Sequence, residues 1–304
     1  MKGLKHKLLP KNNYALSGVI EALLLVALVA IILSTIQLVY IPEIMKQKEN
    51  NHLDEVENQF SNLKSVIETQ SLLGVAQSGE TISYSPMSSP IDLGTKKLPY
   101  FITSNTLGKI EIFDKELCTA KIDLENNPTD YLNGIPLTSI DYEFLTMYIS
   151  YKPKYILEGG GLIYNQTGGT NDTGEVMKVD PSINVENNSN TIKIYYHIPV
   201  LNCPEGKDNL QSIDIAYLRT NYSSYVTHSD TSIGYIRIYT DHLDAWYSSL
   251  IENGKGILWE YYNNNYIDVQ KKSTYVEITP GTKNIDVEFT IIEMGIQTGQ
   301  GTVV

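Results

Sequence analysis

One long apolar stretch, from Val19 to Ile41, dominates the hydropathy pattern of the chain. It contains a single acidic residue, Glu21, and no basic residue. A helix of this length would extend about 34 Å, enough to cross a hydrocarbon core of about 30 Å. No later stretch resembles it, so we expect one N-terminal helix in a membrane or filament core, attached to a soluble body.

A second apolar pattern follows, at spacings of 3, 4, 3 and 4 residues, and predicts that the helix continues with one apolar face. We expect a kink at Pro42, which removes a helical hydrogen bond, and an end near Gly74. The apolar face packs either on the chain's own globular body or on neighbouring subunits. The residues of the face are Leu53, Val56, Phe60, Leu63 and Ile67.

From about Ser83 the pattern changes to short stretches in which apolar and polar residues alternate, separated by Gly, Asn, Asp and Pro. This period of two is typical of antiparallel strands with one solvated face. We predict strands at 109–113, 146–151, 191–198, 212–217, 233–239, 275–278 and 284–292.

These patterns predict an α+β fold, in which a long N-terminal hydrophobic helix precedes a mainly antiparallel β-sandwich head with one short helix. The expected divisions are a basic leader at 1–15, a transmembrane and extended amphipathic helix at 16–74, and a β-rich domain at 83–304.

The short helix is expected within 241–254, with Thr240 or Asp241 as its N-cap and a glycine stop. Asp241, His242 and Asp244 also form a possible metal-ligand cluster, but capping and solvation explain these residues more simply. We expect no metal site and no cofactor.

Charge sets the expected orientation of the chain. Four lysines and no acidic residue precede the apolar stretch, whereas the whole chain has a net charge of −12. Lysines beside a spanning helix stay in the cytoplasm, so the later domain should be extracellular. A cleaved secretory signal is the alternative, although the apolar stretch is longer than signal sequences and lacks a small-residue cleavage site. The acidic body argues against a nucleic-acid partner and leaves membrane lipid as the expected one.

The segment Ala15-Leu-Ser-Gly-Val-Ile-Glu-Ala-Leu-Leu-Leu-Val-Ala resembles the N-terminal motif of archaeal type IV pilin-like proteins. The resemblance covers about 70 residues and extends into the helix around 54–64, which is similar to that of uncharacterised archaeal surface proteins. It implies cleavage by a prepilin-type peptidase between Ala15 and Leu16. The basic residue usual before the cleavage site is replaced by Tyr14, and Glu21 lies one position later than in bacterial pilins.

Glu21 is unusual because a carboxylate in hydrocarbon costs about 2.5–3.5 kcal/mol. The resemblance implies that it pairs with the new N-terminal amine of a neighbouring pilin-like subunit. The alternative is that it lies near enough to the cytoplasmic surface to reach the lipid headgroups.

Two cysteines, Cys118 and Cys203, permit one disulfide in an external domain, although two free, buried thiols are the alternative. Four Asn-x-Ser/Thr sequences are candidate glycosylation sites in an exported protein. They are Asn165, Asn171, Asn187 and Asn221. Gly159 to Gly161 should form a tight turn or a bulge, because a Walker lysine and a following helix are both missing.

The sequence contains no Gly-x-Ser-x-Gly, His-Glu-x-x-His or Cys-x-x-Cys motif, so we expect no enzymatic activity. The functional hypothesis is a pilin-like surface protein, structural or adhesive, held through its N-terminal helix. The alternatives are an anchored extracellular binding module that does not polymerise, and an anchored hydrolase.

Overall fold

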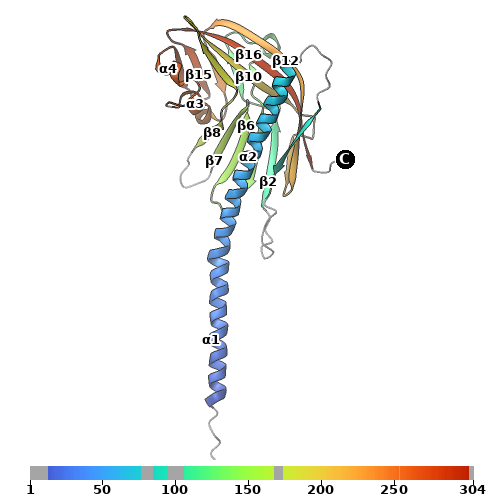
Figure 1. Cartoon of the computed structure of the whole chain (residues 1–304), viewed down its shortest axis with the longest axis vertical. Helices are drawn as coiled ribbons and strands as arrows, with labels where there is room; N and C mark the ends of the chain where they lie inside the picture. The colour runs from blue at the N-terminus through green and yellow to red at the C-terminus, as the bar shows by residue number, and fades with distance from the viewer. Residues whose placement is uncertain (1–12, 77–84, 95–105, 168–173, 253, 301–304) are drawn as a thin grey trace, which may run out of the picture. The chain divides into compact units, whose positions relative to one another are not determined.

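The computed structural model describes residues 13–76, 85–94, 106–167, 174–252 and 254–300 (Figure 1). The chain divides into two compact units, Met1–Lys48 and Glu49–Val304. The division between these units falls inside a helix, because the second half of that helix is packed into the head.

The described part of the first unit, from residue 13 onward, is helical. α1 (Asn13–Thr35) is followed by a π-helical turn at Ile36–Tyr40 and by the first turns of α2 (Ile41–Ala76). The N–H of Ile41 donates to the carbonyl of Ile36, five residues earlier. Pro42 lacks an N–H and crowds the carbonyl four positions before it, so a wider turn just before the proline relieves that conflict. The helix therefore continues through Pro42.

Side chains from Gly18 to Tyr40 are all exposed. Among the described residues, one helical stretch is long and apolar enough to cross a membrane, and it begins near the N-terminus at Gly18. Within the described residues, no other segment of the chain covers the apolar surface of this stretch.

The second unit contains three sheets, all antiparallel except for one parallel pair, β10 with β16. The first sheet has the order β1 (Met87–Asp92), β12 (Ile215–Ile233), β16 (Asn284–Gln300), β10 (Thr191–Asn202) and β9 (Ile183–Asn187). The second has the order β11 (Asn209–Ser212), β2 (Leu107–Phe113), β5 (Ser139–Leu145), β6 (Lys152–Glu158), β7 (Gly161–Thr167) and β8 (Glu175–Val179).

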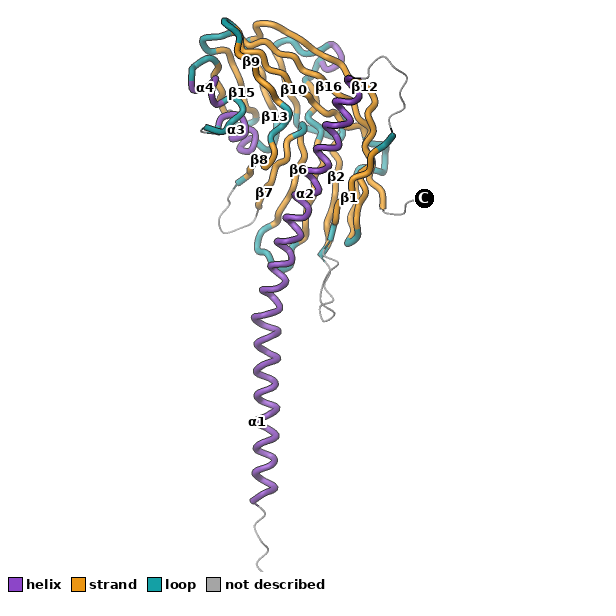
Figure 2. Tube along the Cα trace, viewed as in Figure 1, coloured by secondary structure: helices purple, strands orange, loops and turns teal. Residues whose placement is uncertain are grey.

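The third sheet has the order β14 (Ile267–Lys271), β15 (Tyr275–Pro280), β13 (Ile236–Tyr239), β3 (Lys121–Leu124) and β4 (Ile135–Pro136). Two short helices, α3 (Leu243–Ile251) and α4 (Trp259–Asn263), lie beside this sheet, and a 3₁₀ turn spans Thr129–Tyr131 (Figure 2). The fold is therefore α+β, as the sequence predicted, with α4 as an additional short helix.

Two hydrophobic cores hold the second unit together. One lies between the third sheet, α3, most of β10 and the first half of β16. The other lies between α2, the second sheet, the end of β10 and the second half of β16. Ile291 and Ile292 are adjacent in β16, yet Ile291 belongs to the first core and Ile292 to the second. Successive side chains on a strand point to opposite faces, so one strand contributes to both cores.

The apolar face of α2 is buried in the second core. Leu53, Val56, Phe60, Leu63 and Ile67 are each at most 3% exposed and pack on strands of the head. We expected this face to pack either on the chain's own body or on neighbouring subunits, and the structure shows the first.

The predicted strand at 146–151 is wrong, because these residues form the connection between β5 and β6. Two other predicted strands, 212–217 and 233–239, are each interrupted, at 213–214 and 234–235. The glycine turn is confirmed. Gly159 and Gly160 join β6 to β7 with φ of +55° and +81°, values that favour glycine.

Candidate functional site

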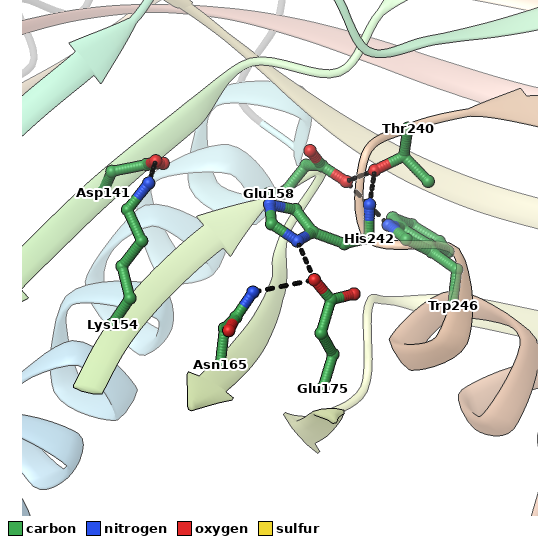
Figure 3. A network of polar contacts seen from close by, with 8 residues as sticks. All are labelled: Asp141, Lys154, Glu158, Asn165, Glu175, Thr240, His242 and Trp246. Carbon is green, nitrogen blue, oxygen red and sulfur yellow. Dashed lines mark hydrogen bonds and ion pairs between the residues drawn. The ribbon is translucent and has the colours of Figure 1, made fainter. Parts of the chain in front are cut away.

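A cluster of polar side chains lies where β6, β7 and β8 approach the end of β13 and the start of α3 (Figure 3). We call it the Glu158 network. Its members are Asp141, Lys154, Glu158, Asn165, Glu175, Thr240, His242 and Trp246.

Glu158 is the last residue of β6 and is 5% exposed. Its Oε1 accepts hydrogen bonds from Thr240 Oγ1 and Trp246 Nε1, both at 2.7 Å. Burial raises the pKa of the Glu158 carboxyl, and nearby Asp141 adds to this effect. The charge of His242 and the two hydrogen bonds oppose it without cancelling it. A carboxyl buried in this way has two good donors, which limits the cost of its desolvation.

His242 sits beside a second carboxylate. Its Nδ1 lies 2.9 Å from Glu175 Oε1, and the same oxygen accepts a 2.7 Å hydrogen bond from Asn165 Nδ2. Burial disfavours the charged imidazole, but the hydrogen bond to Glu175 and the surrounding carboxylates outweigh it. The pKa of His242 is therefore raised. Both pKa shifts favour the protonated form of the group concerned.

The network joins separate parts of the head. Glu158 comes from the second sheet, Thr240 follows the third sheet, and Trp246 lies on α3. Trp246 is fully buried and covers the carboxyl, so the arrangement suits a pH-sensitive structural joint better than a site open to substrate.

Sequence reasoning did not identify Glu158 or Glu175. The available signal was that Glu158 continues the apolar run of β6 directly into three glycines. His242 was considered only with Asp241 and Asp244. In the structure His242 bonds Glu175, and Asp244 pairs with Lys271. The expected N-cap at Thr240 or Asp241 is also wrong, since α3 begins at Leu243 after His242.

A second polar arrangement fixes the helix to the head. Glu49 is fully buried, and its carboxylate accepts the backbone N–H groups of Met147, Tyr148 and Ile149 at 2.8–3.3 Å. We call this contact the Glu49 clamp. Because backbone donors to a carboxylate form strong, charge-assisted bonds, the clamp holds the β5–β6 connection on α2.

One helical turn further, His52 is buried, and its Nε2 lies 3.0 Å from the hydroxyl of Tyr142, which also contacts the carbonyl of Leu93. Burial lowers the pKa of His52 to about 4, despite the opposing influence of Asp92. His52 is therefore neutral at physiological pH and acts as a polar packing residue.

A cavity of about 120 Å³ lies between α2 and the strands of the head. Its polar residues include Lys64 and Glu68, which form an ion pair, and Ser182, which hydrogen-bonds Glu68. Apolar side chains such as Ile67 and Leu157 form much of the remaining wall. This volume is well below the roughly 300–1,000 Å³ of typical small-molecule sites.

The residues expected to direct processing and assembly lie in α1. Ala15 and Leu16 are in its first turns, and their side chains are outside the described part of the structure. Glu21 is exposed, as are its apolar neighbours Leu23 and Leu24. The structure thus places Glu21 on a bare apolar helix but identifies no partner for it.

The two cysteines are free thiols, so the disulfide that the sequence allowed is not formed in this structure. Both lie near Asp114: the N–H of Cys118 donates to its backbone carbonyl, and that of Cys203 to its carboxylate. Burial and this carboxylate raise the pKa of Cys118 to about 11. Burial, Asp208 and Asp114 do the same for Cys203. Thiols with such raised pKa values are weak nucleophiles.

The candidate glycosylation sites differ in their surroundings. Asn187 and Asn221 are exposed, at the end of β9 and within β12. Asn165 is half-buried, and its amide nitrogen, the atom that would carry a glycan, is bonded to Glu175. Asn171 lies outside the described residues. Asn187 and Asn221 are therefore the better-placed candidates of the three that the structure describes.

Comparison of the chain with models of protein families, with curated proteins and with solved structures found no match.

Proposed function

We propose that this protein is a pilin-like surface protein, structural or adhesive, that is anchored or assembled through its N-terminal helix. The observation that carries the proposal is the exposed apolar helix from Gly18 to Tyr40, attached to a head with its own cores. Apolar surface on this scale is costly in water, so it requires lipid or other helices around it. Glycosylation, an archaeal source and an extracellular head belong to the same proposal.

The packing of α2 restricts how subunits could associate. Its apolar face is already buried in the head, so no seam is left there for neighbours. Association in a filament core would use α1, where side chains are free. Glu21 would select how neighbouring subunits associate on that surface, because a carboxylate among apolar side chains needs a positively charged partner.

The proposed partner of Glu21 is the N-terminal ammonium that cleavage between Ala15 and Leu16 would create. Removing one member of such a desolvated pair leaves the other uncompensated, at a cost of about 3–5 kcal/mol. Glu21→Ala should then abolish assembly while membrane insertion and head folding persist.

The test compares protein in sheared extracellular filaments with protein in membranes, for the wild type and for Glu21→Ala, together with mass spectrometry of the native N-terminus. Glu55→Ala, the same substitution at an exposed position of α2 outside the apolar stretch, is the matched control and should leave the sheared fraction largely unchanged. A wild type that never enters the sheared fraction and retains residues 1–15 would contradict the pilin-like function.

The alternative is a single-span anchored binding module that does not polymerise. The exposed apolar helix supports it as well, because lipid alone could cover that surface. In that case Glu21→Ala would change only the ease of membrane insertion.

A further inference from the structure

A surface hollow of about 550 Å³ lies on the second unit and shares no residue with the Glu158 network. Its volume falls within the roughly 300–1,000 Å³ that is typical of ligand sites. Ser224 of β12 and Glu293 of β16, which are paired across the two strands, form part of its lining. The register of this strand pair shifts between Tyr222 and Ser224, and β-bulges of this kind redirect side chains beside binding sites.

The segment between β3 and β4 forms another part of the lining, and hydrogen bonds hold it in place. The hydroxyl of Tyr131 donates to Glu293 Oε1 at 3.1 Å, and Lys121 Nζ donates to the carbonyl of Asn133 at 2.8 Å. The N–H of Gly134 donates to the carbonyl of Tyr131 at 2.9 Å and closes the turn. The hollow is thus formed before a ligand arrives, which lowers the entropic cost of binding.

Apolar side chains from separate elements meet in this hollow. Leu132, which follows the 3₁₀ turn, is 73% exposed, the highest value for a large apolar side chain among the described residues of the second unit. Val226 of β12 is 41% exposed and lines the same hollow, as does Pro136 of β4. Exposed apolar residues that are scattered over a surface are ordinary, whereas a shared hollow offers them a common ligand.

The charged residues of the hollow are mostly acidic. Lys115 lies 3.8 Å from Glu293, while Glu116 and Asp130 are exposed in the same lining. One lysine against three carboxylates leaves a formal net charge of −2. In the part of the chain that the structure describes, no group of three or more His, Cys, Asp or Glu residues could hold a metal ion. The carboxylates are therefore spread over the lining rather than gathered around one ion.

This combination of volume, apolar lining and negative charge matches the side chains of lysine and arginine. Both residues lay an aliphatic stem along apolar surface and keep a charged head free to meet a carboxylate. The chain as a whole has a net charge of −12, so it attracts a basic partner and repels a second copy of itself. Charge complementarity therefore selects a basic polypeptide as the occupant.

We propose that this hollow binds a basic segment of a partner polypeptide, with an aliphatic stem against Leu132 and Val226 and a charged head beside Glu116 and Asp130. The inference rests on the adhesive part of the proposed function, and it gives that function a partner of stated chemistry. It involves the second unit alone, so it does not depend on what covers α1.

Fluorescence anisotropy of dye-labelled peptides, added to the full chain in a non-ionic detergent, tests the proposal. The probe has the sequence Leu-Lys-Leu-Lys-Leu, and the comparison peptide Leu-Gln-Leu-Gln-Leu lacks its charges. The wild type should bind the lysine peptide more tightly than the glutamine peptide, and added salt should weaken that binding.

Variants identify the hollow as the site. Glu116→Gln/Asp130→Asn should weaken binding of the lysine peptide by about 2- to 30-fold, the range for losing two exposed ion pairs. Glu55→Gln/Glu205→Gln removes two exposed carboxylates outside the hollow, so it is the matched control and should leave binding largely unchanged. Leu132→Ser should also weaken binding, and its urea unfolding should match that of the wild type because the side chain is exposed.

Absence of binding to the wild type, equal binding of the two peptides, or equal weakening by the two double variants would overturn the site. Self-association of the chain that Leu132→Ser abolishes would mean that a second copy occupies the hollow, and would overturn it too. The assay reads neither filaments nor membrane insertion, so these results leave the pilin-like anchor intact. Conversely, a wild type that retains residues 1–15 and stays out of the sheared fraction overturns the pilin-like function while peptide binding persists.

Discussion

At the scale of single residues, two buried carboxylates accept hydrogen bonds that join distant segments of this protein. Glu49 and Glu158 are each at most 5% exposed, and both carboxylates accept several hydrogen bonds. Glu49 is satisfied by backbone N–H groups of one loop, Glu158 by side chains from two other elements. Each carboxylate therefore ties together segments that are distant in the sequence.

Removing the Glu49 carboxylate should destabilise the head. Glu49→Ala leaves the N–H groups of Met147, Tyr148 and Ile149 buried without a partner, and we expect a loss of about 3 kcal/mol or more in the free energy of unfolding. Glu49→Gln keeps one acceptor and should cost less. Urea unfolding of the full chain in detergent measures both, with Glu55→Ala, at an exposed position of the same helix, as control. Equal stability of Glu49→Ala and Glu55→Ala would show that the clamp contributes nothing.

His242 should make stability depend on pH. Its pKa in the folded protein is raised above 6.5, so the folded state holds the proton more tightly than the unfolded state. The stabilisation from the charged imidazole is fully present below pH 6.5 and is lost as pH rises through the raised pKa. The unfolding free energy of wild type minus that of His242→Gln should therefore shrink as pH increases above 6.5.

Urea unfolding over a pH series gives that difference. Ser248→Ala, at an exposed position on α3 that does not titrate, serves as the matched control and should give a difference that does not change with pH. A difference for His242→Gln that is constant, or that grows with pH, would contradict the assigned direction.

At the scale of elements, α2 has the central role in the head, because its inner face completes the second core. Phe60 is fully buried there, and its ring lies 6.1 Å from Tyr142 and 6.3 Å from Tyr155, centroid to centroid. The apolar spacing along 53–67 predicted this face correctly, since helix periodicity is a local property. The spacing did not show which surface this apolar face would pack against.

Truncation of this face should weaken the whole head. Phe60→Ala removes a large aromatic side chain from a closed core, and we expect a loss of about 3–5 kcal/mol in unfolding free energy. Asn62→Ala, at an exposed position on the outer face of the same helix, should change it by less than about 0.5 kcal/mol. Thermal or urea unfolding distinguishes them, and a Phe60→Ala variant as stable as Asn62→Ala would mean that α2 is not part of the core.

At the scale of the whole molecule, an acidic head follows a lysine-bearing leader and a bare apolar helix. The asymmetry of charge across the apolar stretch is the basis for the proposed orientation, with the leader in the cytoplasm.

Protease added to intact cells should therefore digest the head and spare an epitope tag at the N-terminus. In the proposed orientation the lysine-bearing N-terminus lies on the inner side of the membrane, so only residues beyond the membrane are accessible. Permeabilised cells are the control, in which both parts should be digested. A protected head in intact cells would contradict the orientation and the surface function built on it.

The sequence by itself determined the long helix, the position of the amphipathic face, the glycine turn at Gly159 and the strands at 109–113, 191–198, 275–278 and 284–292. These features depend on local quantities: the apolar length, the period of 3.6 or 2, and the φ values open to glycine. The lysines at the N-terminus and the net acidic charge likewise follow from composition alone.

Only the tertiary structure decided which elements meet. The parallel pairing of β10 with β16, and the division of Ile291 and Ile292 between two cores, depend on contacts far apart in the chain. The segment 146–151 alternates like a strand, yet it is a loop, because Glu49, about a hundred residues earlier, binds its N–H groups. Glu158 and His242 are likewise brought together by packing between segments that are far apart in the chain. Local patterns specify an element, whereas its partners are chosen by the sum of long-range packing and hydrogen bonds.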